Sequence, residues 1–380
     1  MTHHQMIQTG KDNSTKKEVL YIALELSQKK WKLVLSDGQR KREKTITAGD
    51  REQFESELLK ARKHFKMADD VEMYSCYEAG RDGFWIHRYL ESVGIQNIVV
   101  DPASIEVNRR YRRVKTDSID GHKLVGMLLR HCGGERKVWS VVNVPGEVQE
   151  DERRLNRERD RLKKEKGAHT SRIKSLLALY GIATGFGRNF LVRLEKLRTW
   201  DGKGLPEHIV RELRREYERF DLVERQLKQI ATEKQKKLET CPEMGQKVVK
   251  LKRLSAIGPI SSWDLVYEFF GWRSFKNVKQ VAGAAGLTPS PYSSGQMQLE
   301  QGISKAGNRR IRTLMIELAW GWLRYQGGSK LSLWFEERFG GGGKRMRRIG
   351  IVALARKLLI ALWKYLEHGI VPEGAKLKAA

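Results

Sequence analysis

The amino-terminal part of the chain alternates apolar and polar stretches with the short periods of an α/β domain. In residues 19–36, "VLYIALELSQKKWKLVLS", two apolar stretches flank a polar turn, and "KTIT" at 44–47 is suited to a third strand. These segments predict an antiparallel meander. The pattern then predicts an amphipathic segment, a strand, a helix, a strand and a helix, at 50–65, 70–77, 83–93, 97–100 and from 117.

The predicted order of these elements, βββαβαβα, is the order expected of a ribonuclease H-like (RuvC-like) domain. Actin-like ATPases and sugar kinases share this strand order, but they hold nucleotide phosphates with paired glycine-rich loops. The sequence has no such pair, and its strongly basic composition does not suit them. We therefore expect a RuvC-like α/β domain at residues 18–146, after a disordered tail at 1–17.

From residue 147 to 250 the chain is dense in charges of both signs. Its apolar residues recur at steps of three, four or seven, at Leu155, Leu162, Phe220, Val223, Leu227 and Ile230. This heptad spacing predicts a long helical coiled-coil arm made of two helices along one apolar seam. The segment "RTWDGKGLPEH" contains glycines and Pro206, which suit an antiparallel turn. Such an arm is either a solvated spacer or a dimerisation element.

Beyond residue 250, longer apolar stretches predict a mainly helical domain at 251–369, followed by a tail at 370–380. The turn "IGPI" between two apolar helices resembles a helix-hairpin-helix, in which turn amides face a phosphate. Two strongly apolar helices are predicted at 309–326 and 349–368. The stretch between them, "FGGGGKRMRR", predicts a flexible loop that contacts phosphates through Lys344, Arg345, Arg347 and Arg348.

Composition narrows the class of partner. The 380 residues include 73 Lys or Arg and 46 Asp or Glu, a formal net charge of +27. Such a charge favours nucleic acid, although a merely soluble or ribosome-associated basic protein is an alternative. Three scattered cysteines indicate neither a disulfide framework nor a zinc site. The sequence shows no signal peptide and no apolar run long enough for a membrane span, so we expect a cytoplasmic protein.

Four carboxylates stand where a ribonuclease H-like fold could bring them together. Glu25 is the only charged residue in "VLYIALELS", and Glu78 ends a predicted strand before a glycine-containing turn. Asp117 and Asp120, in "KTDSIDGHKL", are three residues apart and lie on nearly one side of a first helical turn. Acids there also favour the helix dipole, which explains one aspartate more readily than two. Together the four suit one or two Mg²⁺ ions and phosphodiester chemistry.

The polar segment "PYSSGQMQLEQGISKAGNRR" at 291–310 places Ser293 and Ser294 before a glycine, in what we expect to be a loop. A serine hydroxyl is a poor nucleophile at neutral pH unless a base or a metal activates it. No histidine stands nearby, so the natural activating group is a metal bound by the carboxylates. Residues that follow can hold phosphates or simply form a basic helix start: Lys305, Asn308, Arg309 and Arg310.

These motifs, with "YEAGRDG", "AAGLTPSPYSSGQ" and "VALARKLLIALW", resemble the DEDD/serine transposases of insertion-sequence family one-hundred-and-ten. The similarity extends from about residue 19 to 368 and is to the branch whose elements encode a guide-like bridge RNA. It implies that Glu25, Glu78, Asp117 and Asp120 hold Mg²⁺ in a RuvC-like domain. It also implies that Ser294 is the nucleophile of a carboxy-terminal transposase domain.

The position of the nucleophile and the first of the four acids are the two places where this sequence leaves an alternative to, or departs from, the family pattern. The residue that matches the family's nucleophile is Ser294, and its neighbour Ser293 is the alternative. The first acid of the family is usually aspartate, whereas this chain has Glu25, which is one methylene longer. Because Mg²⁺ demands near-octahedral geometry, the longer side chain requires an adjustment of the backbone or of the other ligands.

The resemblance further implies an RNA-guided transposase or recombinase of an insertion sequence. It would cut and rejoin double-stranded DNA, at element ends and target, through a covalent phosphoserine. A structured noncoding RNA from the element would choose the sites, and homodimers would assemble into a tetramer. Two other classes stay open: a metal-dependent Holliday-junction-type nuclease without a serine adduct, and a non-catalytic nucleic-acid-binding protein.

Overall fold

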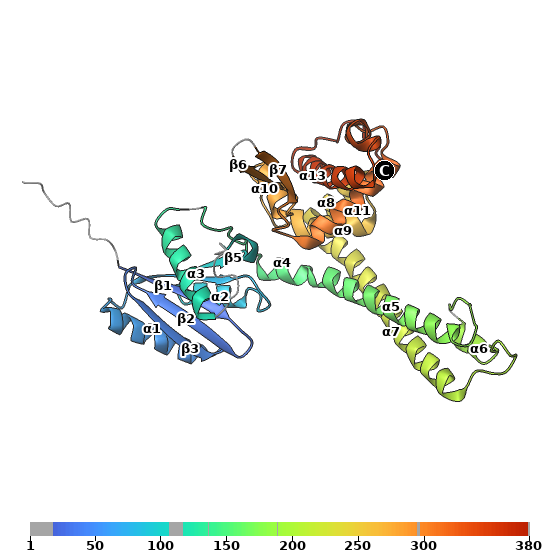
Figure 1. Ribbon diagram of the computed structural model, residues 1–380, viewed down its shortest axis with the longest axis horizontal. Coiled ribbons are helices and arrows are strands. Elements are labelled where there is room, and N and C mark those ends of the chain that lie inside the picture. The colour runs from blue at the N-terminus through green and yellow to red at the C-terminus, as the bar shows by residue number, and fades with distance from the viewer. Residues whose placement is uncertain (1–17, 106–116, 136, 188, 295–296, 379–380) are drawn as a thin grey trace, which may run out of the picture. The chain divides into compact units, whose positions relative to one another are not determined.

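The computed structural model describes residues 18–105, 117–135, 137–187, 189–294 and 297–378, and only the backbone of 117–119, 290–294 and 297–301. The predicted tail at 1–17 lies outside the described residues, as does the last part of the predicted tail at 370–380. The chain divides into two compact units, Met1–Val144 and Pro145–Ala380 (Figure 1).

A five-stranded mixed sheet forms the centre of the first unit, with the order β3-β2-β1-β4-β5. The first three strands are antiparallel, whereas β4 and β5 run parallel to β1. Their bounds are β1 Val19–Leu26, β2 Lys30–Ser36, β3 Lys41–Thr47, β4 Glu72–Glu78 and β5 Gln96–Val100. The predicted order of three antiparallel strands followed by alternating helices and strands is observed.

Helices cover both faces of this sheet. Helices α1 (Arg51–Phe65) and α2 (Trp85–Ser92) pack with Leu20, Ile22 and Leu24 of β1 on one face. Helix α3 (Asp117–Cys132) packs with Ala23 of β1, Val34 of β2 and Cys76 of β4 on the other face. The 3₁₀ turn η1 spans Pro102–Ser104. Because side chains alternate along a strand, a strand buried on both faces is apolar at nearly every position, as β1 is.

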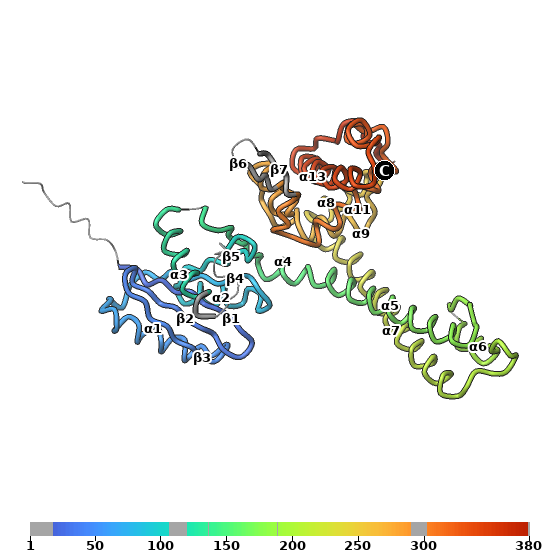
Figure 2. Tube along the Cα trace, in the orientation of Figure 1, coloured from blue at the N-terminus to red at the C-terminus, as the bar shows by residue number. Residues whose placement is uncertain are grey.

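The second unit begins with α4 (Glu147–Glu152) and a two-helix arm, α5 (Arg154–Ala178) and α7 (Glu207–Thr240). The chain runs out along α5 and back along α7 (Figure 2). Lys166 of α5 pairs with Glu224 of α7, and Glu152, just before α5, pairs with Lys237 near the end of α7, so the arm helices are antiparallel. Five of the predicted seam residues form one cluster, Leu155, Leu162, Val223, Leu227 and Ile230, whereas Phe220 belongs to a second cluster at the tip.

The remainder of the second unit is mainly helical and has one core. Its helices are α8 Pro242–Lys252, α9 Pro259–Leu265, α10 Val278–Ala284, α11 Arg309–Tyr325, α12 Lys330–Phe335 and α13 Lys344–His368. Two π-helical turns, η3 (Val266–Phe270) and η4 (Glu336–Gly340), extend α9 and α12. Across the described part of the chain, the helices fall short of the length and apolar character that a bilayer span requires.

Four features of the second unit differ from the prediction. The serine segment is a β-hairpin, β6 (Pro289–Ser294) and β7 (Met297–Ile303), and not a loop. The connection within the arm is longer than predicted, because it includes α6 (Phe190–Leu194). Residues 344–348 are the start of α13 and not part of a flexible loop. The predicted tail returns to the domain, since the backbone N–H of Lys378 donates to the Arg253 carbonyl at 2.7 Å.

Candidate functional site

Glu25 and Glu78 occupy the carboxyl ends of two neighbouring parallel strands in the first unit. The register pairs Leu24 of β1 with Tyr77 of β4, and each glutamate directly follows one of these residues. Both glutamates line one pocket of about 340 Å³. The parallel pairing of β1 with β4 therefore brings two of the four predicted acids to one place at the edge of the sheet.

The same pocket contains a carboxylate that the sequence pattern did not single out. Asp82 lines the pocket from the turn that follows β4. Arg81 forms an ion pair with Asp82, Nη2 to Oδ1, at 3.3 Å, and the Tyr77 hydroxyl donates to the Gly83 carbonyl at 3.2 Å. The signal available in the sequence was an acid in a glycine-containing turn at the carboxyl edge of the sheet.

Helix α3 carries the other two predicted acids and packs against β1, β2 and β4. Gly121 permits a close approach, because a Cβ built on it would lie 2.8 Å from Cγ2 of Val34 in β2. Asp120 directly precedes this contact and is half-buried. Asp117 is the first residue of α3, but its side chain lies outside what the structure describes. The start of α3 therefore lies at the sheet, but the position of the Asp117 carboxylate is not part of what the structure describes.

The donor atoms in the pocket fit a hard divalent cation. Mg²⁺ takes oxygen ligands, and Glu25 and Glu78 offer carboxylate oxygens in one pocket. Among the described side chains, which leave out Asp117, no three His, Cys, Asp or Glu residues are grouped so that they could hold a metal ion. Two of the predicted ligands therefore share the pocket with Asp82, which is paired with Arg81, and the roles of Asp117 and Asp120 stay predictions.

The predicted nucleophile lies in the hairpin of the second unit. Ser293 pairs with Gln298, and Ser294 pairs with Met297. Ser294 is the last residue of β6, and the two residues that follow it, Gly295 and Gln296, lie outside the described residues. The pairing of the backbone does not distinguish Ser294 from Ser293 as the nucleophile.

Two glycines fix the base of this hairpin against the start of α11. Gly307 has a φ of +97°, and a Cβ there would lie 2.4 Å from the Ala284 carbonyl oxygen. Gly286 has a φ of +65°, and its Cβ would lie 2.0 Å from the Ala306 carbonyl oxygen. Between these crossings the Asn308 N–H donates to the Ala284 carbonyl at 2.8 Å. A side chain at either glycine would force the two backbone segments apart.

The predicted phosphate-holding residues beside the hairpin have different surroundings. Lys305 and Arg309 are exposed to solvent. Asn308 caps α11, because its side-chain oxygen accepts from two N–H groups of the first helical turn at 3.0 and 3.2 Å. The Arg310 guanidinium donates to the Asp160 carboxylate of α5. Lys305 and Arg309 are therefore more accessible to a phosphate than Asn308 and Arg310.

A partly buried network of charges links α11 to the arm. Arg159 donates through Nη1 and Nη2 to Asp264 of α9 at 3.1 and 2.8 Å, and Lys234 of α7 lies 3.9 Å from the same carboxylate. Burial lowers the pKa of Lys234 to about 8. Burial also acts to raise the pKa of Asp160, but hydrogen bonds and charges from Arg159 and Arg310 lower it overall. The network ties the arm to the first turn of α11.

Glu268, in the π-helical turn η3, lies directly beneath the start of α11. It is 2% exposed, its carboxylate oxygens have no hydrogen-bond partner in the described part of the chain, and Arg157 Nε lies 3.8 Å away. Burial raises the pKa of this carboxyl group. The Asn308 side-chain amide donates to the Glu268 carbonyl at 3.4 Å. A buried acid with a raised pKa is typical of functional sites, although structural networks produce it too.

The predicted basic loop is a basic helix start. Gly343 precedes α13, whose first turns expose Lys344, Arg345, Arg347 and Arg348. Further along, Gly350 packs against Phe339, because a Cβ there would lie 2.5 Å from the Phe339 ring. That contact holds the helix start against η4. Cations at a helix N-terminus oppose the helix dipole, so an anionic partner would stabilise this arrangement.

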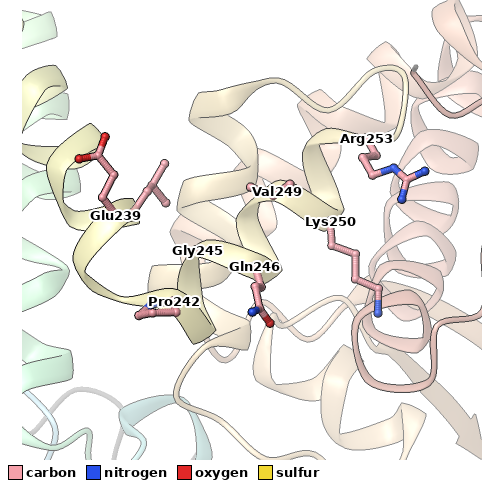
Figure 3. A pocket seen from close by; sticks show the side chains of 8 residues that line it. Glu239, Pro242, Gly245, Gln246, Val249, Lys250 and Arg253 are labelled. Atoms are coloured by element: carbon pink, nitrogen blue, oxygen red, sulfur yellow. The ribbon is translucent and has the colours of Figure 1, made fainter. Parts of the chain in front are cut away.

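A hollow of about 460 Å³ lies along α8 and the end of α7 (Figure 3). Leu238 and Val249 contribute apolar surface, and Lys250 and Arg253 extend at the end away from Glu239. The Lys250 ammonium donates to the Leu366 carbonyl at 3.0 Å. Arg253 directly follows α8, so basic side chains adjoin the turn that resembles a helix-hairpin-helix.

Comparison with known proteins identifies the family. Residues 249–332 match the family described as "Transposase IS116/IS110/IS902 family". The chain is 40% identical over 375 residues, 94% of each chain, to "Putative transposase y4rJ" of Sinorhizobium fredii. It is 25% identical over 304 residues to the transposase for insertion sequence element IS1328 of Yersinia enterocolitica, covering 79% of this chain and 84% of that one. It is 28% identical over 221 residues to the transposase for IS1111A of Coxiella burnetii, covering 57% and 59%. The chain therefore belongs to the IS116/IS110/IS902 family of insertion-sequence transposases.

Proposed function

We propose that this transposase is an RNA-guided, Mg²⁺-dependent recombinase that cuts and rejoins DNA through a covalent phosphoserine at Ser294. The observation that carries the proposal is the shared pocket of Glu25 and Glu78 at the carboxyl ends of β1 and β4. Two predicted metal ligands in one pocket of a basic, DNA-directed protein suit phosphodiester chemistry better than a purely structural role.

The first unit supports a RuvC-like assignment through its topology. Three antiparallel strands are followed by two strands parallel to β1, in the order β3-β2-β1-β4-β5. We assign the acids on this scaffold, Glu25, Glu78, Asp117 and Asp120, as the metal-binding set. When bound, Mg²⁺ would polarise the reacting phosphate and stabilise the charge that develops on the leaving oxygen.

The covalent step is a transesterification. The Ser294 hydroxyl oxygen attacks the phosphorus of a DNA phosphodiester, an Oγ–P bond forms, and the P–O bond to the leaving deoxyribose oxygen breaks. The hydroxyl proton passes to a base or to water, and the leaving oxygen takes up a proton. Attack by a hydroxyl group of another DNA strand reverses the step and joins new strands. The phosphoester is conserved throughout, so the exchange needs no ATP.

Basic helix starts support DNA binding beside the hairpin. Neither α11 nor α13 has an acid in its first turn, and both begin with arginine or lysine. Lys305 and Arg309 expose their charges near the hairpin, and α13 exposes four more. We assign these side chains to the phosphates of the element ends and target, with Arg310 joining them when its ion pair with Asp160 opens.

Guidance by a structured noncoding RNA and assembly of dimers into a tetramer rest on the resemblance of the sequence motifs. The acids lie in one compact unit and the serine in the other. The chemistry requires them to meet, either within one chain or between chains of an assembly. The arm formed by α5 and α7 is the element that we assign to dimerisation.

The test is cleavage by Glu25→Gln and Glu78→Gln, with Glu72→Gln at the opposite end of β4 as the matched control. We expect both pocket variants to bind DNA but not to cut it, while Glu72→Gln cuts normally. Cutting by both pocket variants contradicts the metal-site assignment. Cutting that survives in Ser294→Ala indicates a junction nuclease instead, and binding without cutting by the unaltered protein under all conditions indicates a non-catalytic protein.

A further inference from the structure

Trp200 is the most exposed large apolar side chain among the residues that the structure describes. It is 84% exposed and belongs to the connection between α6 and α7. Figure 1 shows this connection at the tip of the arm. The tip has its own apolar core, in which Phe190, Leu194 and Tyr217 are buried and Trp200 takes no part. Tryptophan is enriched at interfaces, and the indole of Trp200 lies outside this core, so it is available to a partner.

A hydrogen-bonded turn holds Trp200 in this position. The Thr199 N–H donates to the Lys203 carbonyl at 2.8 Å, and the Trp200 N–H donates to the Tyr180 carbonyl at 3.2 Å. Gly181, with a φ of +73°, lies against the tryptophan, because a Cβ there would be 3.1 Å from Trp200 Cβ. The backbone that carries the indole is therefore ordered before any partner binds, which lowers the entropic cost of binding.

The segment that carries Trp200 has an excess of basic residues. Residues 190–205 contain four basic side chains and two acids, a net charge of +2, contributed by Arg193, Lys196, Arg198, Lys203, Glu195 and Asp201. Both acids are paired, Glu195 with Arg214 at 3.4 Å and Asp201 with Lys203 at 2.8 Å. A flat aromatic surface next to positive charge is the combination that binds unpaired nucleotides.

We propose that the tip of the arm binds single-stranded nucleic acid, with an unpaired base stacked on the Trp200 indole and Lys196 and Arg198 near the flanking phosphates. A duplex hides the faces of its bases, and a second copy of this tip would bring the same positive charge. Only the choice of nucleic acid as the partner rests on the proposed function. The proposed binding is independent of Ser294 and of the carboxylates.

The test uses the full chain and three fluorescein-labelled probes: a 12-nucleotide single-stranded RNA, the DNA strand of the same sequence, and the 12-base-pair DNA duplex. Affinities are measured without divalent cations at moderate salt, so that failure of the cleavage chemistry does not affect the result. The variants are Trp200→Ala, Trp200→Tyr, and Val192→Ala as a control at another exposed apolar position of the tip, 66% exposed.

We expect Trp200→Ala to weaken binding of at least one single strand by about tenfold, with little change for the duplex. Trp200→Tyr and Val192→Ala should bind nearly as the unaltered protein does. A loss confined to the RNA or to the DNA identifies the strand that the tip binds. Unchanged single-strand affinity in Trp200→Ala overturns the proposal, and a simultaneous loss of dimers by light scattering would assign the tip to a contact between copies.

Discussion

Replacing Gly307 by alanine perturbs the base of the serine hairpin through backbone geometry alone. At a φ of +97° an alanine is strained by about 1–2 kcal/mol. Its Cβ would also lie 2.4 Å from the Ala284 carbonyl oxygen and 2.8 Å from the carbonyl carbon. Relieving such contacts moves backbone and typically costs about 1–3 kcal/mol more. After a gain of about 0.4–1 kcal/mol through the unfolded state, we expect Gly307→Ala to lower the free energy of unfolding by about 1–4.5 kcal/mol.

Gly302 supplies the matched control. Its φ is +88°, but a Cβ there would have no atom within 4 Å, so Gly302→Ala introduces the strain without the clash. We expect that variant to lose at most about 1.6 kcal/mol. Urea unfolding measures both losses, and amide hydrogen exchange at Asn308 reports the bond to Ala284. Equal losses in the two variants, or unchanged exchange at Asn308 in Gly307→Ala, would refute the reasoning.

Three further predictions concern charge. Asp160→Asn should free Arg310 and tighten DNA binding by about twofold to fivefold, because half-exposed ion pairs contribute about 0.2–1 kcal/mol. The control Asp221→Asn, which breaks an exposed ion pair with Arg225 on α7, should leave DNA binding unchanged. Equal DNA affinities for both variants would contradict the role of Arg310. The pKa of Lys234 is about 8 in the folded protein, below the usual value near 10.5, so the unfolded chain binds more protons between these pH values and stability rises with pH across them. Lys234→Met should remove this rise, which amounts to at most about 3 kcal/mol. If thermal unfolding gives an unchanged dependence of stability on pH in that variant, Lys234 is not the cause. The DNA association constant should fall steeply as the salt concentration rises, with a slope of about −5 when the logarithms of the two quantities are plotted against each other. A slope near zero would contradict binding through the basic surface.

The sequence was sufficient to predict the order of strands and helices in the first unit, and it drew attention to two acids that share a pocket there. Apolar runs bounded by turns predicted two interior strands, β1 and β2, most directly, because strands buried in a sheet tolerate few polar residues. The edge strand β3, which is polar and largely exposed, was predicted only over its last four residues. Glu25 stood out as the only charge in such a run. Its proximity to Glu78 follows from the parallel pairing of β1 with β4, which the predicted strand order implied.

Features that depend on distant contacts could not be predicted. The hairpin β6–β7 is rich in serine, glycine and proline, so its local pattern resembles a loop, and only cross-strand pairing makes it a sheet. The start of α13 follows four glycines, and its position depends on the packing of Gly350 against Phe339. The contact of Asp160 with Arg310 joins residues 150 positions apart, which no periodicity in the sequence reveals.

The measurement that tests the central claim most directly is covalent trapping. Purified protein, the noncoding RNA of its element, Mg²⁺ and nicked DNA that mimics an element end are mixed, and DNA attached to protein is sought by denaturing gel and mass spectrometry. The account predicts an adduct on Ser294 that is lost in Ser294→Ala and kept in Ser293→Ala. DNA that is cut without any adduct, or an adduct carried by Ser293, would contradict it.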